Sequence, residues 1–563
     1  MMEYAIEAQK ISFKYLRSTQ PALSQVDYVQ NIGEAVGICG RSGAGKSSLL
    51  FCLNRIIPEF FAGEFSGKVR ILGEDISGLR TYQLAEKVGI VLQDFESQLF
   101  CSRAELDIAF GPENLGISRE EISKRIESAL ETVGIKKLRK RAPETLSGGE
   151  KQRLAIASVL ALEPQILIFD EATTDLDPVG KEQIWELVEK FKEQNKTIII
   201  VEHEPEALFN MNRIVILEKG EVVAEGGRDE ILSQPFLLKK YGVKPPQISE
   251  LFYHLGIPYK PIDTAQASKI LKEQGFCVDD EKAKEILSQE EKIKPNSALF
   301  EISSLYHTYP NQVNALKGID LEIYEGDFLA IVGQNGSGKT TLVKHLNGLF
   351  LPTKGQVKYK GREIKKGDIT WLSQKIGFVF QNPDHQIFSS RVYDEVAFAP
   401  RNYGFTEQEI NRQVEWALDL VGLTGKEDAN PFLLTKGERQ RLAIASVLSA
   451  DPEVLILDEP TTGLDYQEQV RVMELLKRLN QEGRTIIIIT HTIWLVAEYA
   501  KRAVVMAEGE IITDGAPREI FVKSDVMERA DLKPPEITEL GIKMGFAFLS
   551  VDEAQKILKQ RNK

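Results

Sequence analysis

The sequence contains the same series of motifs twice, and this duplication constrains the fold more than any other feature. Residues 40–48, GRSGAGKSS, return as GQNGSGKTT at residues 333–341, and ILIFDEATTDLD at residues 166–177 returns as VLILDEPTTGLD at residues 454–465. Most matched positions are 288 residues apart, far above the period of roughly 20–50 residues that solenoid repeats show. We therefore predict two whole domains of one kind.

The two halves differ in length between the glycine-rich loop and a matched glutamine. Gln93 and Gln381 are 288 positions apart, whereas Lys46 and Lys339 are 293 apart. The first half therefore holds five extra residues, which we expect in a longer loop near residues 58–67, an aromatic and glycine-containing stretch.

Each half ends in the same appendage, because VKPPQISEL at residues 243–251 matches LKPPEITEL at residues 532–540. The Lys-Pro-Pro step prevents a helix from continuing, and helical spacing follows it. Two interpretations stay open: a linker with a packing helix, or a contact between the halves. The predicted divisions are a first main domain at 1–235, its appendage and linker at 236–296, a second main domain at 297–525 and a second appendage at 526–563. The Lys- and Glu-rich stretch that ends at Pro295, Asn296 and Ser297 is the predicted linker.

Short apolar runs in each half predict an α/β fold. The expected strands are residues 34–40, 165–170 and 197–201 in the first half and 327–333, 453–458 and 485–489 in the second. Continuous apolar strands that alternate with helical segments are typical of a mainly parallel sheet covered on both faces. Residues 94–145 show helical spacing with few strand signals, so we expect a helical subdomain there.

Composition and charge exclude several classes of protein. The chain has 70 basic and 83 acidic residues, a net charge of -13, which argues weakly against a nucleic-acid partner. Its four cysteines lie far apart without C-x-x-C spacing, so no disulfide framework or metal–cysteine cluster is expected. No run of about 18 apolar residues and no signal peptide are found. Any membrane role is therefore expected to come through a partner.

Both glycine-rich loops have the pattern G-x-x-x-x-G-K-(Ser/Thr), which predicts nucleotide triphosphate binding. Backbone amides of such a loop wrap the phosphates, and the helix that follows favours their negative charge. Lys46 and Lys339 would reach the β- and γ-phosphates, and Ser47 and Thr340 would offer hydroxyls to Mg²⁺. The expected ATP-binding residues are Gly40, Arg41, Ser42, Gly43, Ala44, Gly45, Lys46, Ser47 and Ser48, and Gly333, Gln334, Asn335, Gly336, Ser337, Gly338, Lys339, Thr340 and Thr341.

Carboxylates at two strand ends complete the predicted chemistry. Asp170 and Asp458 end apolar strands, where a carboxylate can hold Mg²⁺. Glu171 and Glu459 follow directly and are the candidate bases for the attacking water. His203 and His491 end the next strand, where a side chain could meet the γ-phosphate; a structural role for each histidine is the alternative.

The segment LSGGE at residues 146–150, together with these motifs, makes each half resemble an ATP-binding-cassette (ABC) ATPase. The resemblance implies a head-to-tail pseudodimer within the chain, in which each ATP lies between the loop of one half and the signature of the other. It implies signature roles for Ser147, Gly148, Gly149, Glu150, Thr435, Lys436, Gly437 and Glu438, catalytic and Mg²⁺ roles for Gln93 and Gln381, and adenine stacking by Tyr15 and Tyr309. Packing in the core is the alternative for each tyrosine.

A narrower resemblance follows the two glutamines. QNPDHQIF at residues 381–388 is similar to the segment typical of energy-coupling factor (ECF) transporters, and QDFESQLF at residues 93–100 is a looser copy. The resemblance implies a peripheral ATPase at the cytoplasmic face of the membrane, bound to a membrane scaffold (T component) and a substrate-binding membrane subunit (S component). Asp94, Glu96 and Asp384 would accept arginines of the scaffold. The cargo would be a vitamin or a transition-metal ion.

The second signature departs from the family pattern, because Lys436 replaces the first glycine of the pair. The site with Lys46 and Glu171 would use this altered signature, so we expect the site with Lys339 and Glu459 to be faster. Three rival interpretations remain: a soluble tandem ATPase that acts on ribosomes or nucleic acid, an ATPase of another transporter subgroup, and a non-catalytic ATP-gated scaffold.

Overall fold

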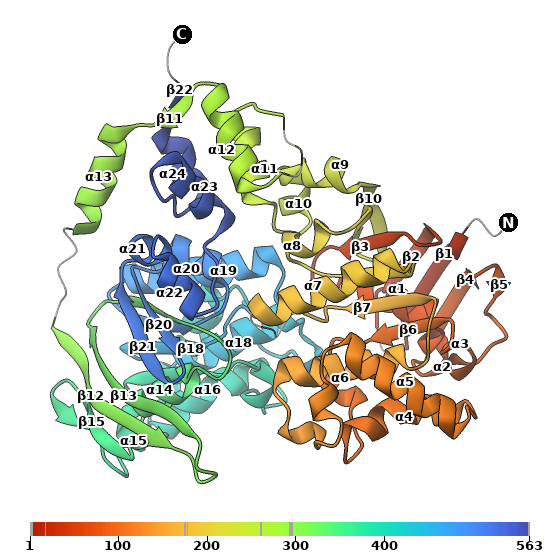
Figure 1. Ribbon diagram of the computed structural model, residues 1–563. Coiled ribbons are helices and arrows are strands. Elements are labelled where there is room, and N and C mark those ends of the chain that lie inside the picture. The colour runs from red at the N-terminus through yellow and green to blue at the C-terminus, as the bar shows by residue number, and fades with distance from the viewer. Residues whose placement is uncertain are drawn as a thin grey trace. The chain divides into compact units, whose positions relative to one another are not determined.

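The chain forms two compact units, Met1–Pro246 and Gln247–Lys563, each with one copy of the repeated motifs (Figure 1). The computed structural model describes residues 4–16, 18–173, 176, 178–258, 260, 262–291 and 297–560. Pro295 and Asn296 of the predicted linker lie outside the described residues.

The core of the first unit is a six-stranded sheet with the order β10-β9-β3-β8-β7-β6, parallel except for the edge strand β10. Its strands are β3 (Ala35–Cys39), β6 (Val88–Val91), β7 (Ile166–Asp170), β8 (Thr197–Val201), β9 (Arg213–Glu218) and β10 (Glu221–Gly227). Every residue of β3, β7 and β8 is buried, as expected for strands covered on both faces. The predicted α/β fold with a mainly parallel sheet is confirmed.

A second, antiparallel sheet with the order β2-β1-β4-β5 was not predicted. Its strands are β1 (Tyr4–Tyr15), β2 (Leu23–Asn31), β4 (Gly63–Ile71) and β5 (Glu74–Asp75). Each of its long strands places apolar side chains mainly on one face, which contributes to the same core as β3.

The helices of the first unit cover its sheets and form the helical subdomain. They are α1 (Lys46–Leu53), α2 (Ile56–Glu59), α3 (Thr81–Leu84), α4 (Ala104–Asn114), α5 (Arg119–Thr132), α6 (Gly148–Leu160), α7 (Pro178–Glu193), α8 (Pro205–Leu208), α9 (Arg228–Leu232) and α10 (Pro235–Lys240). Helices α4 and α5 pack against α6, and the stretch 94–145 contains only helical elements among its assigned structure (Figure 1, orange). The predicted helical subdomain is therefore present.

The five extra residues of the first half are not simply a loop. Ser12 pairs with Ser66 in the first half, and the matching residues Tyr306 and Lys354 pair in the second. The two halves are thus aligned again at Ser66, so the insertion lies between α1 and Ser66. It contributes α2 and the first residues of β4, which continue the antiparallel ladder beside Phe13 and Tyr15. The prediction of a loop at 58–67 is wrong for residues 63–67, which belong to strand β4. Pairing with β1 satisfies their backbone hydrogen-bonding groups.

The second unit repeats both sheets. The large sheet has the order β17-β18-β19-β14-β20-β21, with β21 antiparallel, and the small one β13-β12-β15-β16. The strands are β12 (Ala298–Thr308), β13 (Asn314–Tyr324), β14 (Phe328–Val332), β15 (Lys354–Tyr359), β16 (Arg362–Glu363), β17 (Ile376–Val379), β18 (Val454–Asp458), β19 (Thr485–Ile489), β20 (Arg502–Ala507) and β21 (Glu510–Gly515). The helices are α14 (Lys339–Leu346), α15 (Ile369–Leu372), α16 (Val392–Asn402), α17 (Glu407–Leu420), α18 (Lys436–Leu448), α19 (Tyr466–Gln481), α20 (Ile493–Tyr499), α21 (Pro517–Phe521) and α22 (Ser524–Arg529).

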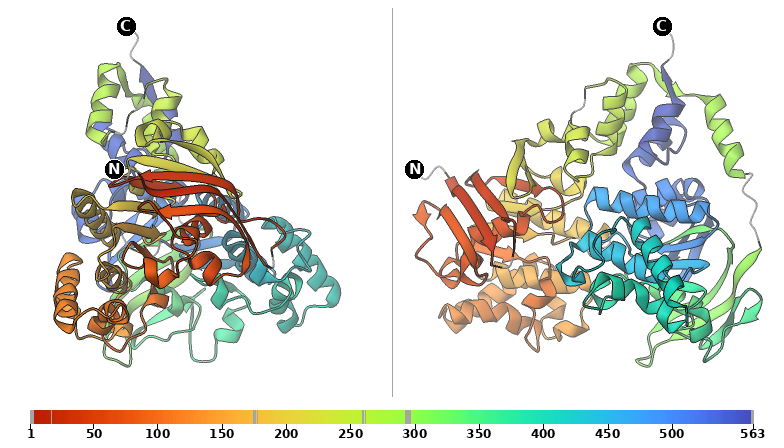
Figure 2. Two further views of the ribbon diagram at one scale, coloured as in Figure 1. Left: turned by 90° about the vertical axis from the view of Figure 1, so that its right-hand side faces the viewer. Right: turned by 180° about the vertical axis from the view of Figure 1, so that it is seen from behind.

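The two appendages pack against each other within the second unit (Figure 2). They contain α11 (Gln247–His254), α12 (Thr264–Glu273), β11 (Phe276–Val278) and α13 (Asp280–Glu291), and α23 (Glu536–Met544), α24 (Val551–Ile557) and β22 (Leu558–Gln560). Strands β11 and β22 pair antiparallel, and α12 packs against α23. Oγ1 of Thr264 donates to Oε1 of Glu539 at 2.6 Å, and a shared apolar cluster fills the interior. Of the two open interpretations, the structure therefore favours a contact between the halves.

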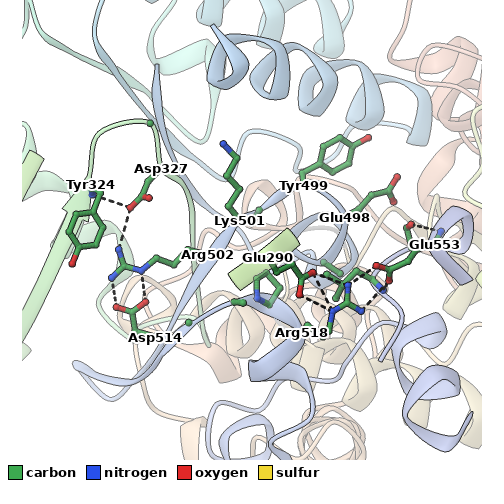
Figure 3. Close-up of a pocket in the computed structure, with 18 of the residues that line it drawn as sticks. Glu290, Tyr324, Asp327, Glu498, Tyr499, Lys501, Arg502, Asp514, Arg518 and Glu553 are labelled. Atoms are coloured by element: carbon green, nitrogen blue, oxygen red, sulfur yellow. Dashed lines mark hydrogen bonds and ion pairs between the residues drawn. The ribbon is translucent and has the colours of Figure 1, made fainter. Parts of the chain in front are cut away.

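Arg518 connects these appendages to the second ATPase-type domain at the edge of a cavity of about 800 Å³ (Figure 3). This arginine of α21 is 6% exposed, and its guanidinium contacts the carboxylates of Glu290 on α13 and Glu553 on α24. It therefore joins three segments that are distant in sequence. The first half has Asp229 at the matching position.

Candidate nucleotide sites

The glycine-rich loops connect a buried central strand to a helix in each half, β3 to α1 and β14 to α14. Gly40 and Gly333 have φ angles of 137° and 147°. A Cβ atom at these positions would lie 2.0 Å from the Leu217 carbonyl oxygen and 2.1 Å from that of Met506. Only glycine lets the loop turn this close to the neighbouring strand.

The two loop lysines are buried and fold back onto their own loops. Nζ of Lys46 donates to the carbonyl oxygens of Gly40 and Arg41, both at 3.0 Å. Nζ of Lys339 donates to those of Gly333 at 2.8 Å and Gln334 at 2.7 Å. Each ammonium is thus held at the centre of its loop, where phosphate oxygens would replace the carbonyl partners.

Glu171 is the centre of a polar cluster in the first half. Its Oε1 lies 3.0 Å from Nε2 of His203 and 3.8 Å from Nζ of Lys46. Its Oε2 accepts a hydrogen bond of 2.7 Å from the side-chain amide of Gln93. The structure thus brings four predicted site residues together.

The second half has the same pair of glutamate and histidine, but the other nitrogen of the histidine ring faces the carboxylate. Oε2 of Glu459 lies 2.9 Å from Nδ1 of His491. Burial raises the pKa of Glu459, but the nearby His491 and Lys339 outweigh this effect, so its pKa lies below the usual value. The carboxylate is therefore ionised at neutral pH, as a base must be.

A cavity of about 440 Å³ collects most of the predicted residues of the second half. Its lining includes Tyr309, Lys339, Thr340, Gln381, Asp458 and Glu459. The signature residues 435–438 are not among the described residues that line it. This half therefore assembles its phosphate-binding and acidic groups in one place without its own signature.

The residues present fit a bound Mg²⁺ ion. Oγ1 of Thr340 donates to Oδ2 of Asp458 at 2.9 Å, and the Ser47 side chain hydrogen-bonds to Asp170 in the same way. Oδ1 of Asp170 is buried without a hydrogen-bond partner among the described residues, an acceptor that a cation or its water would satisfy. Burial and the neighbouring Glu171 raise the pKa of Asp170 to about 6, and a cation would lower it again.

The signature residues begin matched helices. Ser147 caps α6 and Thr435 caps α18, each in a capping box with the glutamate three residues later, Glu150 or Glu438. A Cβ atom at Gly148 would meet nothing within 4 Å, so the fold tolerates a side chain there. In the second half, Lys436 occupies the matching position as the first residue of α18.

The two predicted stacking tyrosines lie beside the loop helices. The Tyr15 hydroxyl is 3.0 Å from Oγ of Ser48, and the Tyr309 hydroxyl is 3.0 Å from Oγ1 of Thr341. Tyr309 also lines the cavity described above. Both rings are therefore tied to the helix that follows the glycine-rich loop.

Sequence reasoning missed Glu202, a buried carboxylate next to His203. Its Oε1 accepts hydrogen bonds from the backbone N–H and the hydroxyl of Thr173, two residues after Glu171. Burial raises the pKa of Glu202 to about 7. One feature of the sequence could have drawn attention to Glu202: the matching position of the second half holds an uncharged residue, Thr490.

Comparison with known proteins agrees with this geometry. A family model described as ABC transporter matches residues 23–174 and 316–462, which together exceed half of the chain. The chain belongs to the ABC transporter family of ATP-binding proteins, with two tandem cassettes. It is an ATPase that uses ATP with Mg²⁺ and couples ATP hydrolysis to transport.

Relatives extend over the whole chain. An ABC transporter ATP-binding protein of Caldanaerobacter subterraneus subsp. tengcongensis is 45% identical over 97% of this chain and 98% of its own length. One of Methanosarcina acetivorans is 38% identical, with coverage of 99% and 94%. The solved structure of cbiO1 from Clostridium perfringens, described as part of the ABC transporter complex cbiONQ, is 38% identical and covers 43% of this chain and 98% of its own, with a TM-score of 0.39.

As an ABC transporter subunit, the chain works with membrane components. No helix within the described residues is long and apolar enough to cross a bilayer.

Proposed function

We propose that this chain energises an ECF-type importer of a vitamin or a transition-metal ion, from the cytoplasmic face of the membrane. In this proposal both cassettes bind a membrane scaffold (T component) that carries a substrate-binding subunit (S component). The observation that carries the proposal is a pair of matched apolar surfaces that follow Gln93 and Gln381.

Each surface presents two exposed phenylalanine rings in the same geometry. Phe100 and Phe110 meet edge to face with centroids 4.7 Å apart, and Phe388 and Phe398 do so at the same distance. Phe100 is 63% exposed and Phe388 is 60% exposed. Exposed apolar groups that recur at matching places in both halves are characteristic of a binding surface for another protein.

Buried carboxylates hold these rings in place. Oδ1 of Asp107 accepts hydrogen bonds from the backbone N–H groups of Phe100 and Cys101, both at 3.0 Å. Oε2 of Glu395 accepts the matching bonds from Phe388 and Ser389 at 3.1 and 2.8 Å. A backbone held in this way at Phe100 and Phe388 loses little entropy when an apolar helix of a scaffold binds.

The acidic residues expected to attract scaffold arginines have partners within the chain. Glu96 contacts Nζ of Lys151 at 2.7 Å, and Asp384 contacts Nε of Arg439 at 2.7 Å. Asp94 caps the short helix η1 (Phe95–Gln98). Lys151 and Arg439 each lie four residues after the signature Ser147 or Thr435, so these ion pairs connect the proposed scaffold surface to the signature helix.

We further propose composite ATP sites, in which Lys46, Glu171 and His203 use the signature with Lys436, and Lys339, Glu459 and His491 use residues 147–150. Residues 435–438 are not among the described residues that line the cavity around Lys339, which supports a contribution from the other half. Fusion of both cassettes in one chain would raise their effective concentration for each other.

In the proposed reaction, water attacks the γ-phosphorus, the bond to the β–γ bridging oxygen breaks, and ADP and phosphate leave. Glu171 or Glu459 accepts the proton of the attacking water, and His203 or His491 orients the carboxylate. The loop lysine neutralises charge on the phosphates. Bound Mg²⁺, held by Ser47 with Asp170 or Thr340 with Asp458, would supply further charge neutralisation.

The test is reconstitution with the host's membrane proteins. The tagged full-length chain is incubated with detergent-solubilised membranes, and a Phe100→Ser/Phe388→Ser variant is the matched control. We expect the wild type alone to retain polytopic membrane subunits, and the purified complex in vesicles to import a vitamin or metal ion with ATP. Retention of ribosomes in place of membrane subunits, or equal retention by the variant, would contradict the proposal.

A further inference from the structure

Two aromatic rings meet each candidate stacking tyrosine edge to face. In the second half, Tyr309 meets His307 edge to face at 4.9 Å and 82°, and meets Phe350 at 5.8 Å and 86°. His307 and Phe350 stack on each other at 5.0 Å with an interplanar angle of 11°. The tyrosine ring therefore stands perpendicular to two parallel rings.

The first half reproduces the contacts to the tyrosine. Tyr15 meets Phe13 at 4.7 Å and 77°, and meets Phe61 at 5.9 Å and 87°. Phe13, like His307, lies two residues before the tyrosine. Phe61 is stacked on a further ring, that of Phe51, at 5.6 Å and 5°.

Segments of different length deliver the second ring. Phe350 follows Lys339 by 11 residues, whereas Phe61 follows Lys46 by 15, in the region that holds the five-residue insertion. The insertion changes the path of the chain and adds α2, yet the edge-to-face contact differs by only 0.1 Å and 1° between the halves. Preservation of the contact despite this change indicates that the ring has a role at the tyrosine.

Core packing does not account for Phe61, because this side chain is 41% exposed. A phenylalanine placed for stability alone would gain more from full burial. The edge-to-face contact instead fixes the plane of Tyr15, whose hydroxyl is already held by Ser48. Together the two contacts restrain both ends of the tyrosine ring.

We propose that Phe61 and Phe350 are positioning residues that hold Tyr15 and Tyr309 ready to stack on a purine base. The inference rests on the proposed ATP sites. Each phenylalanine acts through its tyrosine: the edge contact occupies one side of the ring, and the hydroxyl bond anchors it to the loop helix. Both tyrosines are only half-buried, so part of each ring is accessible, and a base that stacks there would not have to immobilise the ring on binding.

The proposal predicts which part of the nucleotide is affected. Stacking uses the flat face that every base has, so it distinguishes adenine from guanine little. The phosphates would be held by the glycine-rich loop and its lysine, and not by the aromatic rings. Loss of the phenylalanine should therefore weaken binding of ATP and GTP alike and leave binding of tripolyphosphate unchanged.

The experiment measures binding of Mg²⁺ complexes of ATP, GTP and tripolyphosphate to the full chain by calorimetry. In a Lys46→Ala background, ATP binding at the first site is weakened, so the effect of Phe350→Leu reports on the second site. We expect Phe350→Leu to weaken ATP and GTP binding by about 3–10-fold, as expected for the loss of an aromatic pair. Phe350→Tyr, which keeps an aromatic edge, should bind like the wild type. Phe405→Leu is the matched control, because Phe405 is also a half-buried phenylalanine of the second half and is not among the described residues that line the cavity around Lys339.

Phe61→Leu in a Lys339→Ala background tests the first half independently, at a side chain whose exposure makes misfolding a minor concern. Unchanged ATP affinity in both leucine variants would overturn the proposal, as would an equal loss of tripolyphosphate binding. Failure of the wild-type chain to bind ATP at all would instead contradict the proposed ATP sites.

Discussion

Glu171 and His203 form a buried hydrogen-bonded pair, with Oε1 of the glutamate 3.0 Å from Nε2 of the histidine. Nδ1 of His203 is buried and has no hydrogen-bond partner among the described residues. In the second half, Glu459 meets His491 through Nδ1 instead, at 2.9 Å. The two imidazole rings therefore present different nitrogens to their surroundings, so the two sites differ in geometry as well as in the signature residue expected to face them.

Glu459→Gln should abolish most ATP turnover of the assembled transporter, by about 100-fold or more, because it removes the base of the site expected to be faster. Glu171→Gln should leave a larger fraction of turnover. The measurement is phosphate release by the reconstituted complex, with both variants at equal protein concentration. The opposite result, in which Glu171→Gln abolishes turnover and Glu459→Gln leaves it near normal, would reverse the assignment.

Lys436→Gly should raise the residual turnover of the Glu459→Gln variant several-fold. The substitution restores the glycine that allows close approach of backbone to phosphate, and Gly148 at the matching position of the first half shows that glycine can begin this helix. It also removes a positive charge from the N-terminus of α18, where cations are unfavourable. Slower phosphate release in the double variant would instead show that Lys436 contacts the γ-phosphate productively.

The sequence predicted the central strands well, because each ends in a motif whose chemistry requires a strand before it. Strand β8 was predicted with its observed bounds, and β3 and β7 to within one residue at each end. The small antiparallel sheet was not predicted. Its central pair, β1 with β4, joins segments separated by the whole glycine-rich loop and α1. No local pattern encodes such pairing.

The residues that the structure gathers around Glu171 and around Lys339 had been predicted wherever a motif names them, and their roles stay predictions. Glu202 was missed, because its significance depends on burial and on a bond to Thr173, neither of which is visible in one sequence. Phe61 was noticed only as part of an aromatic stretch, and its contact with Tyr15 became clear from ring geometry. Contacts between segments that no motif connects require the folded structure.

Glu202→Gln should stabilise the protein at pH 8 and have little effect near pH 4.5. The folded-state pKa of Glu202 is raised to about 7 by burial, so the folded protein keeps a proton that the unfolded chain releases above about pH 4.5. This contribution to stability is present below pH 4.5 and is lost as pH rises towards 7. The glutamine keeps an acceptor for Thr173 without the ionisation cost, so the gain at pH 8 should be about 2–3 kcal/mol.

The measurement for Glu202 is urea unfolding of wild type and variant from pH 4.5 to 8, provided that unfolding is reversible. Thr490→Val, at the matching position of the second half, is the control and should give a difference that does not vary with pH. A constant difference for Glu202→Gln across this range would show that Glu202 is already ionised in the folded protein.

Arg518→Leu should destabilise the second unit by about 3 kcal/mol, because the substitution leaves the carboxylates of Glu290 and Glu553 without their buried cation. Asp229→Leu, at the matching position of the first half, is the control; Asp229 is exposed, so a change within about 0.5 kcal/mol is expected.

Adding Glu290→Gln and Glu553→Gln to Arg518→Leu should recover most of the loss, since no charge then remains unpaired. Urea unfolding checks these values, and limited proteolysis after α13 should be faster in Arg518→Leu alone. Equal unfolding midpoints for Arg518→Leu and wild type would mean that the apolar contacts between the appendages, and not this ion cluster, hold α13 in place.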